Sequence, residues 1–106
     1  MPYGLKRFIG NVREDDEFVQ VVGKVVKVLG KTKFTIEDKT GKIDCEPIPD
    51  DCPKLSEKLI VKVYGWVRLD DDVKTYLEPI VVQDKTGLDL DMYYKTLEMF
   101  IKIAYK

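Results

Sequence analysis

A long valine-rich segment with a glycine near its middle constrains the fold of this chain more than any other feature. Residues 18–29 read FVQVVGKVVKVL. β-Branched residues favour strands, and a glycine inside a strand marks a bulge or a sharp bend. We therefore expect a long strand that bends at Gly23 and pairs with different strands on its two sides, as the first strand of a small closed barrel must.

Four further segments alternate apolar and polar residues, which is typical of half-buried strands: residues 32–38, 42–48, 59–67 and 74–83. Asp38-Lys39-Thr40-Gly41 is the expected hairpin turn between the first two, and the prolines after residue 46 predict a loop over 49–58. Residues 3–9 form either a short strand or an ordered arm, and 10–17 form a polar turn.

This order of elements predicts an all-β protein, a five-stranded OB-fold barrel followed by a C-terminal α-helix. An SH3-like barrel is the alternative, although its strands are shorter. The expected parts are an N-terminal arm (residues 1–17), the barrel (18–88) and an assembly helix (89–106).

The C-terminal segment has helical periodicity, with Asp89 or Asp91 as its N-cap. Its charged residues fall on one narrow stripe. The remaining positions form two apolar seams, the first made by Leu90, Tyr94, Leu97, Ile101 and Ala104 and the second by Met92, Thr96, Met99 and Ile103, with Tyr93 and Phe100 bridging them.

A helix that packs only on its own barrel needs one apolar face, and this helix has two. We therefore expect a partner helix to contact Met92, Tyr93, Thr96, Met99, Phe100 and Ile103. The alternative is a helix wedged deeply into its own domain, so that both seams are covered internally.

The segment 59–67 carries the clearest candidate binding face. If Val61, Val63 and Val67 point into the core, then Lys62, Tyr64 and Trp66 point outward. Exposed aromatic rings with cations beside them can stack the bases of a single strand. The other candidate nucleic-acid-binding residues are Lys31, Lys33, Thr35, Lys42, Arg68, Lys74 and Tyr76.

Two observations oppose that interpretation. Asp70, Asp71 and Asp72 lie in a loop that should cover a bound strand, and Glu37, Asp44 and Glu46 share the outward parity. The aromatic residues could instead be the seat of the C-terminal helix.

Composition excludes several other classes of protein. The 18 basic and 19 acidic residues give a net charge of −1, which excludes a strongly basic nucleic-acid module and a polybasic membrane binder. Without histidine, and with only Cys45 and Cys52, no zinc site or catalytic constellation is expected. We expect no cofactor, no metal, no membrane span, no enzymatic activity, reduced structural thiols and a cytoplasmic location, associated with the nucleoid in a prokaryote.

Three runs carry a resemblance to a known family: Val22–Val26, Phe34–Ile43 and Val61–Val67. They resemble the OB domain of replication protein A and its archaeal relatives, and the resemblance covers residues 18–83. It implies a small subunit that binds single-stranded DNA in replication, repair and recombination. Its terminal helix would bundle with helices of other OB-fold subunits, an arrangement similar to that of related telomere-capping complexes.

By position, the resemblance gives Tyr64, Trp66 and Tyr76 the role of stacking aromatics and places Lys31 and Lys33 in the first binding loop. Residues 70–72 depart from the family, whose binding members have basic or aromatic residues there. Two alternatives stay open, an OB-fold adaptor that binds only protein and an RNA-binding or anticodon-binding OB module.

Overall fold

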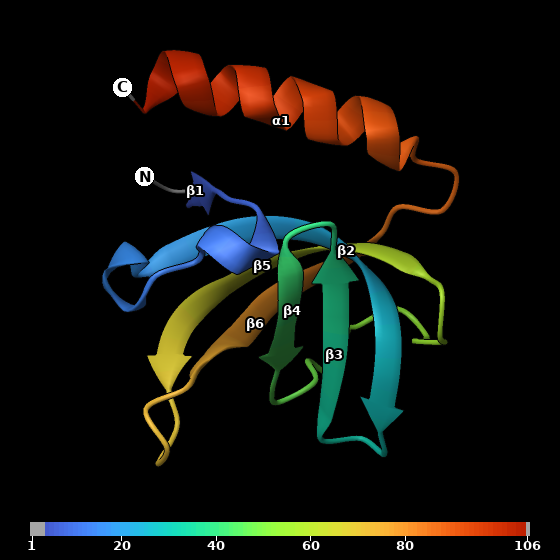
Figure 1. Cartoon of the computed structure of the whole chain (residues 1–106). Helices are drawn as coiled ribbons and strands as arrows, with labels where there is room; N and C mark the ends of the chain where they lie inside the picture. The colour runs from blue at the N-terminus through green and yellow to red at the C-terminus, as the bar shows by residue number, and fades with distance from the viewer. Residues whose placement is uncertain (1–3, 106) are drawn as a thin grey trace.

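The chain forms a five-stranded barrel with a short extra strand and one α-helix (Figure 1). The structure, a computed structural model, describes residues 4–105, so residues 1–3 of the predicted arm and residue 106 of the predicted helix lie outside the described part. The elements are β1 (Leu5–Lys6), the 3₁₀ turns η1 (Ile9–Asn11) and η2 (Glu14–Asp16), β2 (Phe18–Leu29), β3 (Lys33–Asp38), β4 (Gly41–Cys45), β5 (Ile60–Leu69), β6 (Thr75–Asp84) and α1 (Leu90–Ala104).

The strands are ordered β1-β2-β3-β4-β6-β5, and pairing of β2 with β5 closes the barrel. Neighbouring barrel strands are antiparallel except β4 and β6, which are parallel and joined through a single pair, Cys45 with Leu77. This topology and the C-terminal helix confirm the predicted OB-fold. The short strand β1 runs parallel to β2 outside the barrel.

Strand β2 divides between two neighbours, as its sequence predicts. Phe18 to Lys24 pair with β5, and Lys24 to Leu29 pair with β3 across a bulge between Val25 and Lys27. Gly23 stands at the junction, where a Cβ would lie 2.8 Å from Ile9 Cδ1 and 2.9 Å from a backbone oxygen of β3. The bend therefore requires a residue without a side chain.

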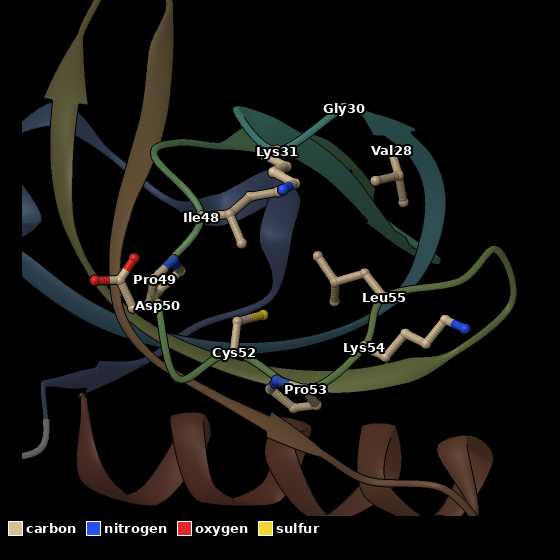
Figure 2. A pocket seen from close by; sticks show the side chains of 10 residues that line it. All are labelled: Val28, Gly30, Lys31, Ile48, Pro49, Asp50, Cys52, Pro53, Lys54 and Leu55. Carbon is tan, nitrogen blue, oxygen red and sulfur yellow. The ribbon is translucent and has the colours of Figure 1, made fainter.

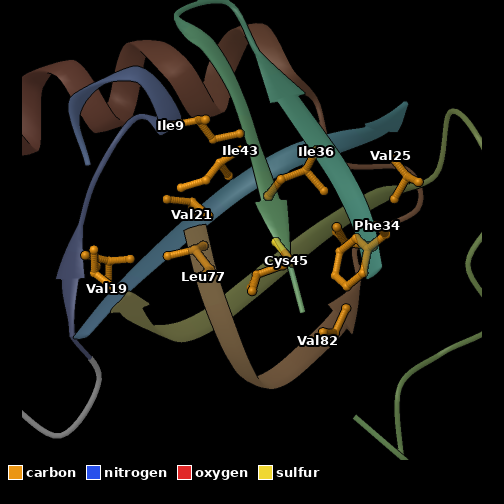
Figure 3. Close-up of a cluster of buried hydrophobic side chains, with 13 residues drawn as sticks. Ile9, Val19, Val21, Val25, Phe34, Ile36, Ile43, Cys45, Leu77 and Val82 are labelled. Carbon is orange, nitrogen blue, oxygen red and sulfur yellow. The ribbon is translucent and has the colours of Figure 1, made fainter. Parts of the chain in front are cut away.

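The inward residues of all five barrel strands form one apolar core (Figure 3). Cys45 is fully buried in it, and burial raises the pKa of its thiol well above the ordinary range. Cys52 is half-buried in the loop between β4 and β5, and both cysteines are free thiols. A buried neutral thiol behaves as a small apolar side chain, so Cys45 is a packing residue.

The N-terminal arm packs on the barrel more closely than the sequence indicates. Phe8 and Ile9 are buried, and the predicted polar turn over 10–17 contains two 3₁₀ turns instead. The Ile9 amide donates to Asp38 Oδ2 at 2.8 Å, while Asp38 Oδ1 accepts from the Thr40 amide at 2.7 Å. One carboxylate thereby closes the β3–β4 turn and holds the arm against it.

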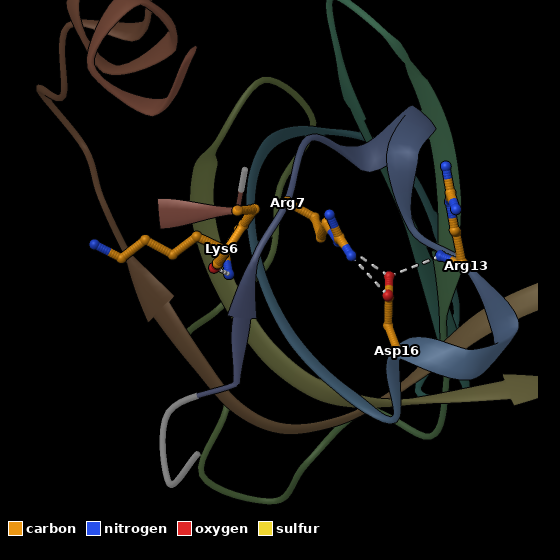
Figure 4. Close-up of polar contacts among 5 residues, drawn as sticks. Lys6, Arg7, Arg13 and Asp16 are labelled. Carbon is orange, nitrogen blue, oxygen red and sulfur yellow. Dashed lines mark hydrogen bonds and ion pairs between the residues drawn. The ribbon is translucent and has the colours of Figure 1, made fainter. Parts of the chain in front are cut away.

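A second carboxylate organises the rest of the arm (Figure 4). The Arg7 guanidinium donates to both oxygens of Asp16 at 2.9 and 3.2 Å, and Asp16 Oδ2 also accepts from the Arg13 amide at 2.9 Å. This bidentate pair fixes η2 at the position where the chain enters β2.

Candidate functional site

Strand β5 has the predicted parity. Val61, Val63 and Val67 are buried in the barrel, and the side chains between them point outward. Trp66 keeps 39% of its surface exposed. Its ring packs edge-on against Phe18 with centroids 4.8 Å apart.

The outward residues of β5 do not share one environment, because α1 reaches part of the strand. Burial, followed by the nearby Asp38, Tyr94 and Tyr64, raises the pKa of Tyr93 on α1 to about 12. Tyr64 therefore lies near the helix. The Lys62 ammonium stands 5.2 Å from the centre of the Tyr64 ring. The alternative role of the aromatics, as the seat of the helix, stays open for Tyr64, whereas Trp66 contacts Phe18.

A second group of predicted residues lies on the outer face of β3 and β4. Lys33 pairs with Asp44 at 3.7 Å and Lys42 pairs with Glu37 at 3.7 Å. The Thr35 hydroxyl donates to Asp44 Oδ1 at 2.7 Å. Each strand lysine on this face thus has a carboxylate partner, which lowers the charge available to a phosphate.

The barrel topology separates these two groups of residues. β3 and β5 have no direct pairing, and β4 and β6 lie between them on one side of the barrel. The expectation that Lys33 and Lys42 flank a platform on β5 is therefore wrong, because other strands separate β3 from β5. Arg68, which was expected beside the same platform, does lie there, with its guanidinium carbon 5.7 Å from the centre of the Trp66 ring.

Tyr76 on β6 lies between the two groups. It pairs across strands with Arg68, whose guanidinium also bonds Glu78 at 2.9 Å. On its other side, Tyr76 lines an open hollow with Lys31, Thr32, Glu46 and Pro47. OB-folds bind oligonucleotides on the face of their second and third strands, between flanking loops. This Tyr76 hollow lies beside that face and has one ring and one cation.

The three aspartates of the β5–β6 turn include one with a structural role. Asp70 Oδ1 accepts from the amides of Asp72 and Lys74, both at 2.9 Å. Asp71 and Lys74 are exposed. A phosphate group near this turn would therefore meet one lysine side chain among three aspartates. Across residues 4–105, acidic and cysteine side chains form no group of three or more that could hold a metal ion.

Helix α1 begins as predicted, with the Asp89 side chain accepting from the Met92 amide at 3.1 Å. Its first seam faces the protein. Leu97 is buried, and the Tyr94 ring packs 5.9 Å from Phe8. Glu98 forms an ion pair with Lys39 of the β3–β4 turn. No helix in the described part of the chain is long and apolar enough to cross a membrane.

The C-terminal end of α1 is tied to the arm. The Lys6 amide donates to the hydroxyl of Tyr105 at 3.0 Å, and the Lys6 ammonium lies 4.7 Å from the centre of the Phe100 ring. Phe100 and Tyr93 are half-buried against their own domain. The arm and barrel thus cover part of each ring, and only the remaining part is open to the predicted partner helix.

The second seam is uncovered in this structure. Met92, Met99 and Ile103 expose 60%, 64% and 72% of their surfaces. Thr96 between them is also exposed. We call these four residues the outer stripe of α1. The outer stripe lies opposite the packed seam, so the alternative of a helix with both seams covered internally is wrong.

Sequence reasoning missed one feature. The loop between β4 and β5 lines a hollow at one end of the barrel, together with the β2–β3 turn. Ile48 and Leu55 in this loop, apolar residues among prolines, were the signal that could have indicated it.

The closed barrel and the helix that follows it define an OB-fold protein with a C-terminal helix. No protein-family model matches the chain, and no curated protein matches its sequence.

Solved structures are similar in fold. The S. pombe Stn1–Ten1 complex aligns with a TM-score of 0.76 and 14% identity over 92% of this chain and 91% of that chain. Telomere capping protein Ten1 from Saccharomyces pombe gives 0.77 and 13% over 92% and 96%. U. maydis replication protein A bound to single-stranded DNA gives 0.66 and 19% over 94% and 95%. Because α1 spans Leu90–Ala104 of the 106 residues, matches that cover 92% or more of this chain include part of α1.

Proposed function

We propose that this chain is the small OB-fold subunit of a single-stranded DNA-binding assembly of replication protein A type, joined to other OB-fold subunits through α1. The outer stripe of α1 carries the proposal. Structures of similar fold support it, since one is a complex of Stn1 with Ten1 and another is replication protein A bound to single-stranded DNA.

The free energy of burying apolar side chains favours a state in which a partner covers the outer stripe. Full burial of one Met or Ile side chain stabilises by about 1.5–3 kcal/mol relative to exposure. Met92, Met99 and Ile103 are all mostly exposed, and they repeat along one side of a helix whose other side is packed. Helix-to-helix contact buries such a row of side chains efficiently, because ridges of one helix fit grooves of the other.

The DNA-binding part of the proposal rests on the barrel. Tyr76 and Trp66 would stack bases, and Lys31 beside Tyr76 and Lys74 in the β5–β6 turn would meet phosphates. The ion pairs of Lys33 and Lys42 with carboxylates favour modest affinity by this chain alone. The subunit would protect exposed strands in replication, repair and recombination, in the cytoplasm or, in a prokaryote, at the nucleoid.

Co-expression with the larger OB-fold subunits of the source organism tests assembly. We expect a stable complex by size-exclusion chromatography with light scattering, and we expect Met99→Lys with Ile103→Lys to abolish it while the variant stays folded. Lys95→Ala with Lys102→Ala, on the charged stripe of the same helix, is the matched control and should assemble normally. Normal assembly of the Met99/Ile103 variant would rule out the outer stripe as the interface.

Intrinsic fluorescence tests DNA binding by the isolated chain, because Trp66 is its single tryptophan. Oligo-dT at low salt should quench Trp66, and Tyr76→Ala should weaken binding by about 1–3 kcal/mol, the contribution of one stacked base. Met92→Ala should change nothing. Competition by oligo-U compares the affinities of the chain for RNA and DNA. Absence of quenching would show that Trp66 is not part of the binding surface.

A second candidate is an OB-fold adaptor that binds protein only. The acidic partners of the β3 and β4 lysines and the three aspartates after β5 favour it. This candidate predicts no retention of DNA by the isolated chain in electrophoretic-shift experiments, but a stable complex through α1.

A further inference from the structure

The β2–β3 turn lies at the end of the barrel away from α1 (Figure 1). A hollow of about 470 Å³ lies beside this turn (Figure 2). Its walls come from the end of β2, the β2–β3 turn and the loop between β4 and β5. The lining residues are Val28, Gly30, Lys31, Ile48, Pro49, Asp50, Cys52, Pro53, Lys54 and Leu55. We call it the end hollow.

The floor of the end hollow is apolar. Val28, Ile48 and Leu55 are half-buried and pack against the barrel core. Figure 2 shows these three side chains around one space, with the Cys52 thiol in the wall. The loop over residues 46–59, which forms part of the wall, contains neither helix nor strand.

The rim of the end hollow carries two lysines, Lys31 and Lys54, and one aspartate, Asp50. Lys31 and Lys54 come from different loops, and both are exposed. Within residues 4–105, neither lysine belongs to an ion pair, unlike Lys33 and Lys42 on the strands. Figure 2 shows the Asp50 carboxylate pointing away from the space that the apolar side chains surround.

We propose that the end hollow is a docking site for an acidic peptide segment of a partner protein, with one large apolar side chain inserted between Ile48 and Leu55. Carboxylates beside that anchor would meet Lys31 and Lys54. This site is separate from the outer stripe of α1, so it adds a second protein contact to the proposed function without depending on it.

The lining favours a peptide over a nucleotide. Bases bind to sequence-tolerant sites by stacking on aromatic rings, and they are read by hydrogen bonds to their edges. Among residues 4–105, those that line the end hollow include no aromatic ring and no side-chain amide or hydroxyl group. The ring on this side of the barrel belongs to the Tyr76 hollow, which shares only Lys31 with the end hollow.

The rate at which Cys52 is alkylated measures whether the end hollow is occupied. Cys52 lines the hollow and is half-buried, whereas Cys45 is fully buried and shielded in the folded chain. Burial raises the pKa of the Cys52 thiol, so its alkylation by N-ethylmaleimide is followed at mildly alkaline pH by mass spectrometry. The probe is the peptide acetyl-EELFEE-amide, and acetyl-KKLFKK-amide is its charge-reversed control.

We expect a saturating concentration of the acidic peptide to slow alkylation of Cys52 about fivefold or more, with no protection by the basic peptide. Lys31→Glu with Lys54→Glu changes only exposed residues, and it should raise the half-protecting concentration of acidic peptide about fivefold or more. Met99→Lys with Ile103→Lys on α1 should leave protection unchanged.

Three results would overturn the proposal. The first is no protection by the acidic peptide, and the second is equal protection by both peptides, which would show apolar contact without charge selection. The third is protection by oligo-dT alone, which would assign the end hollow to nucleic acid. Failure of assembly through α1, or of DNA binding, would leave the peptide result standing.

Discussion

The two seams of α1 predict a large and a small loss of stability for two substitutions only two positions apart. Leu97 is 3% exposed and packs toward the arm and barrel, while Met99 is 64% exposed. Truncating a buried leucine to alanine removes packed methyl groups and leaves a cavity, which costs about 2–5 kcal/mol. We expect Leu97→Ala to lower the free energy of unfolding by about 3 kcal/mol and Met99→Ala to change it by less than about 0.5 kcal/mol.

Urea unfolding followed by far-ultraviolet circular dichroism and by Trp66 fluorescence measures both variants. With a slope of about 1–1.5 kcal/mol per molar urea for a domain of this size, Leu97→Ala should shift the midpoint down by about 2–3 M. Circular dichroism reports the helix and fluorescence reports the barrel. An earlier loss of the dichroism signal alone would mean that α1 detaches before the barrel unfolds.

The comparison between Leu97 and Met99 can refute the reasoning. If Met99→Ala destabilises as much as Leu97→Ala, the outer stripe is buried in solution. Repeating the measurement over a hundredfold range of protein concentration then identifies the cause, because stability gained by self-association depends on concentration. A cost that does not change with concentration would contradict the exposed outer stripe itself.

Three further tests use other substitutions. Gly23→Ala should cost about 1–3 kcal/mol in thermal or urea unfolding, because its Cβ would lie 2.9 Å from the Glu37 carbonyl oxygen, whereas Gly41→Ala, with its nearest contact at 3.6 Å, should be tolerated. Glu37→Gln with Asp44→Asn should tighten oligo-dT binding about three- to tenfold and steepen its salt dependence, measured by fluorescence titration, and unchanged affinity would exclude the β3–β4 face. Burial raises the pKa of Tyr93 to about 12, so the unfolded chain ionises first; stability should be complete below pH about 10 and decline toward pH 12, and Tyr93→Phe should flatten that decline.

Much of the fold could be predicted because local sequence pattern and tertiary structure agree. Alternation over residues 32–38 and 59–67 specifies which side chains enter the core, and those positions are buried in the structure. Gly23 indicates the division of β2 because only glycine tolerates the close approach there. The arm was less predictable, since Phe8 and Ile9 are buried by residues distant in sequence.

The candidate site was harder to predict than the fold. The alternation along β5 correctly predicted that Lys62, Tyr64 and Trp66 point outward. Alternation within one strand does not indicate which outward surfaces of different strands lie next to one another. Closure of the barrel sets β3 and β5 apart, so the lysines of β3 and β4 do not flank Trp66. Pairing of Lys33 with Asp44 likewise depends on the register between β3 and β4.

The sequence by itself determined the strands, the bend in β2 and a terminal helix with two apolar seams, because each depends on residue periodicity within one segment. Only the tertiary structure decided which seam is covered, which lysines are already paired and where the end hollow forms. Those properties arise between segments far apart in the chain, where burial and charge depend on what the closed barrel brings together.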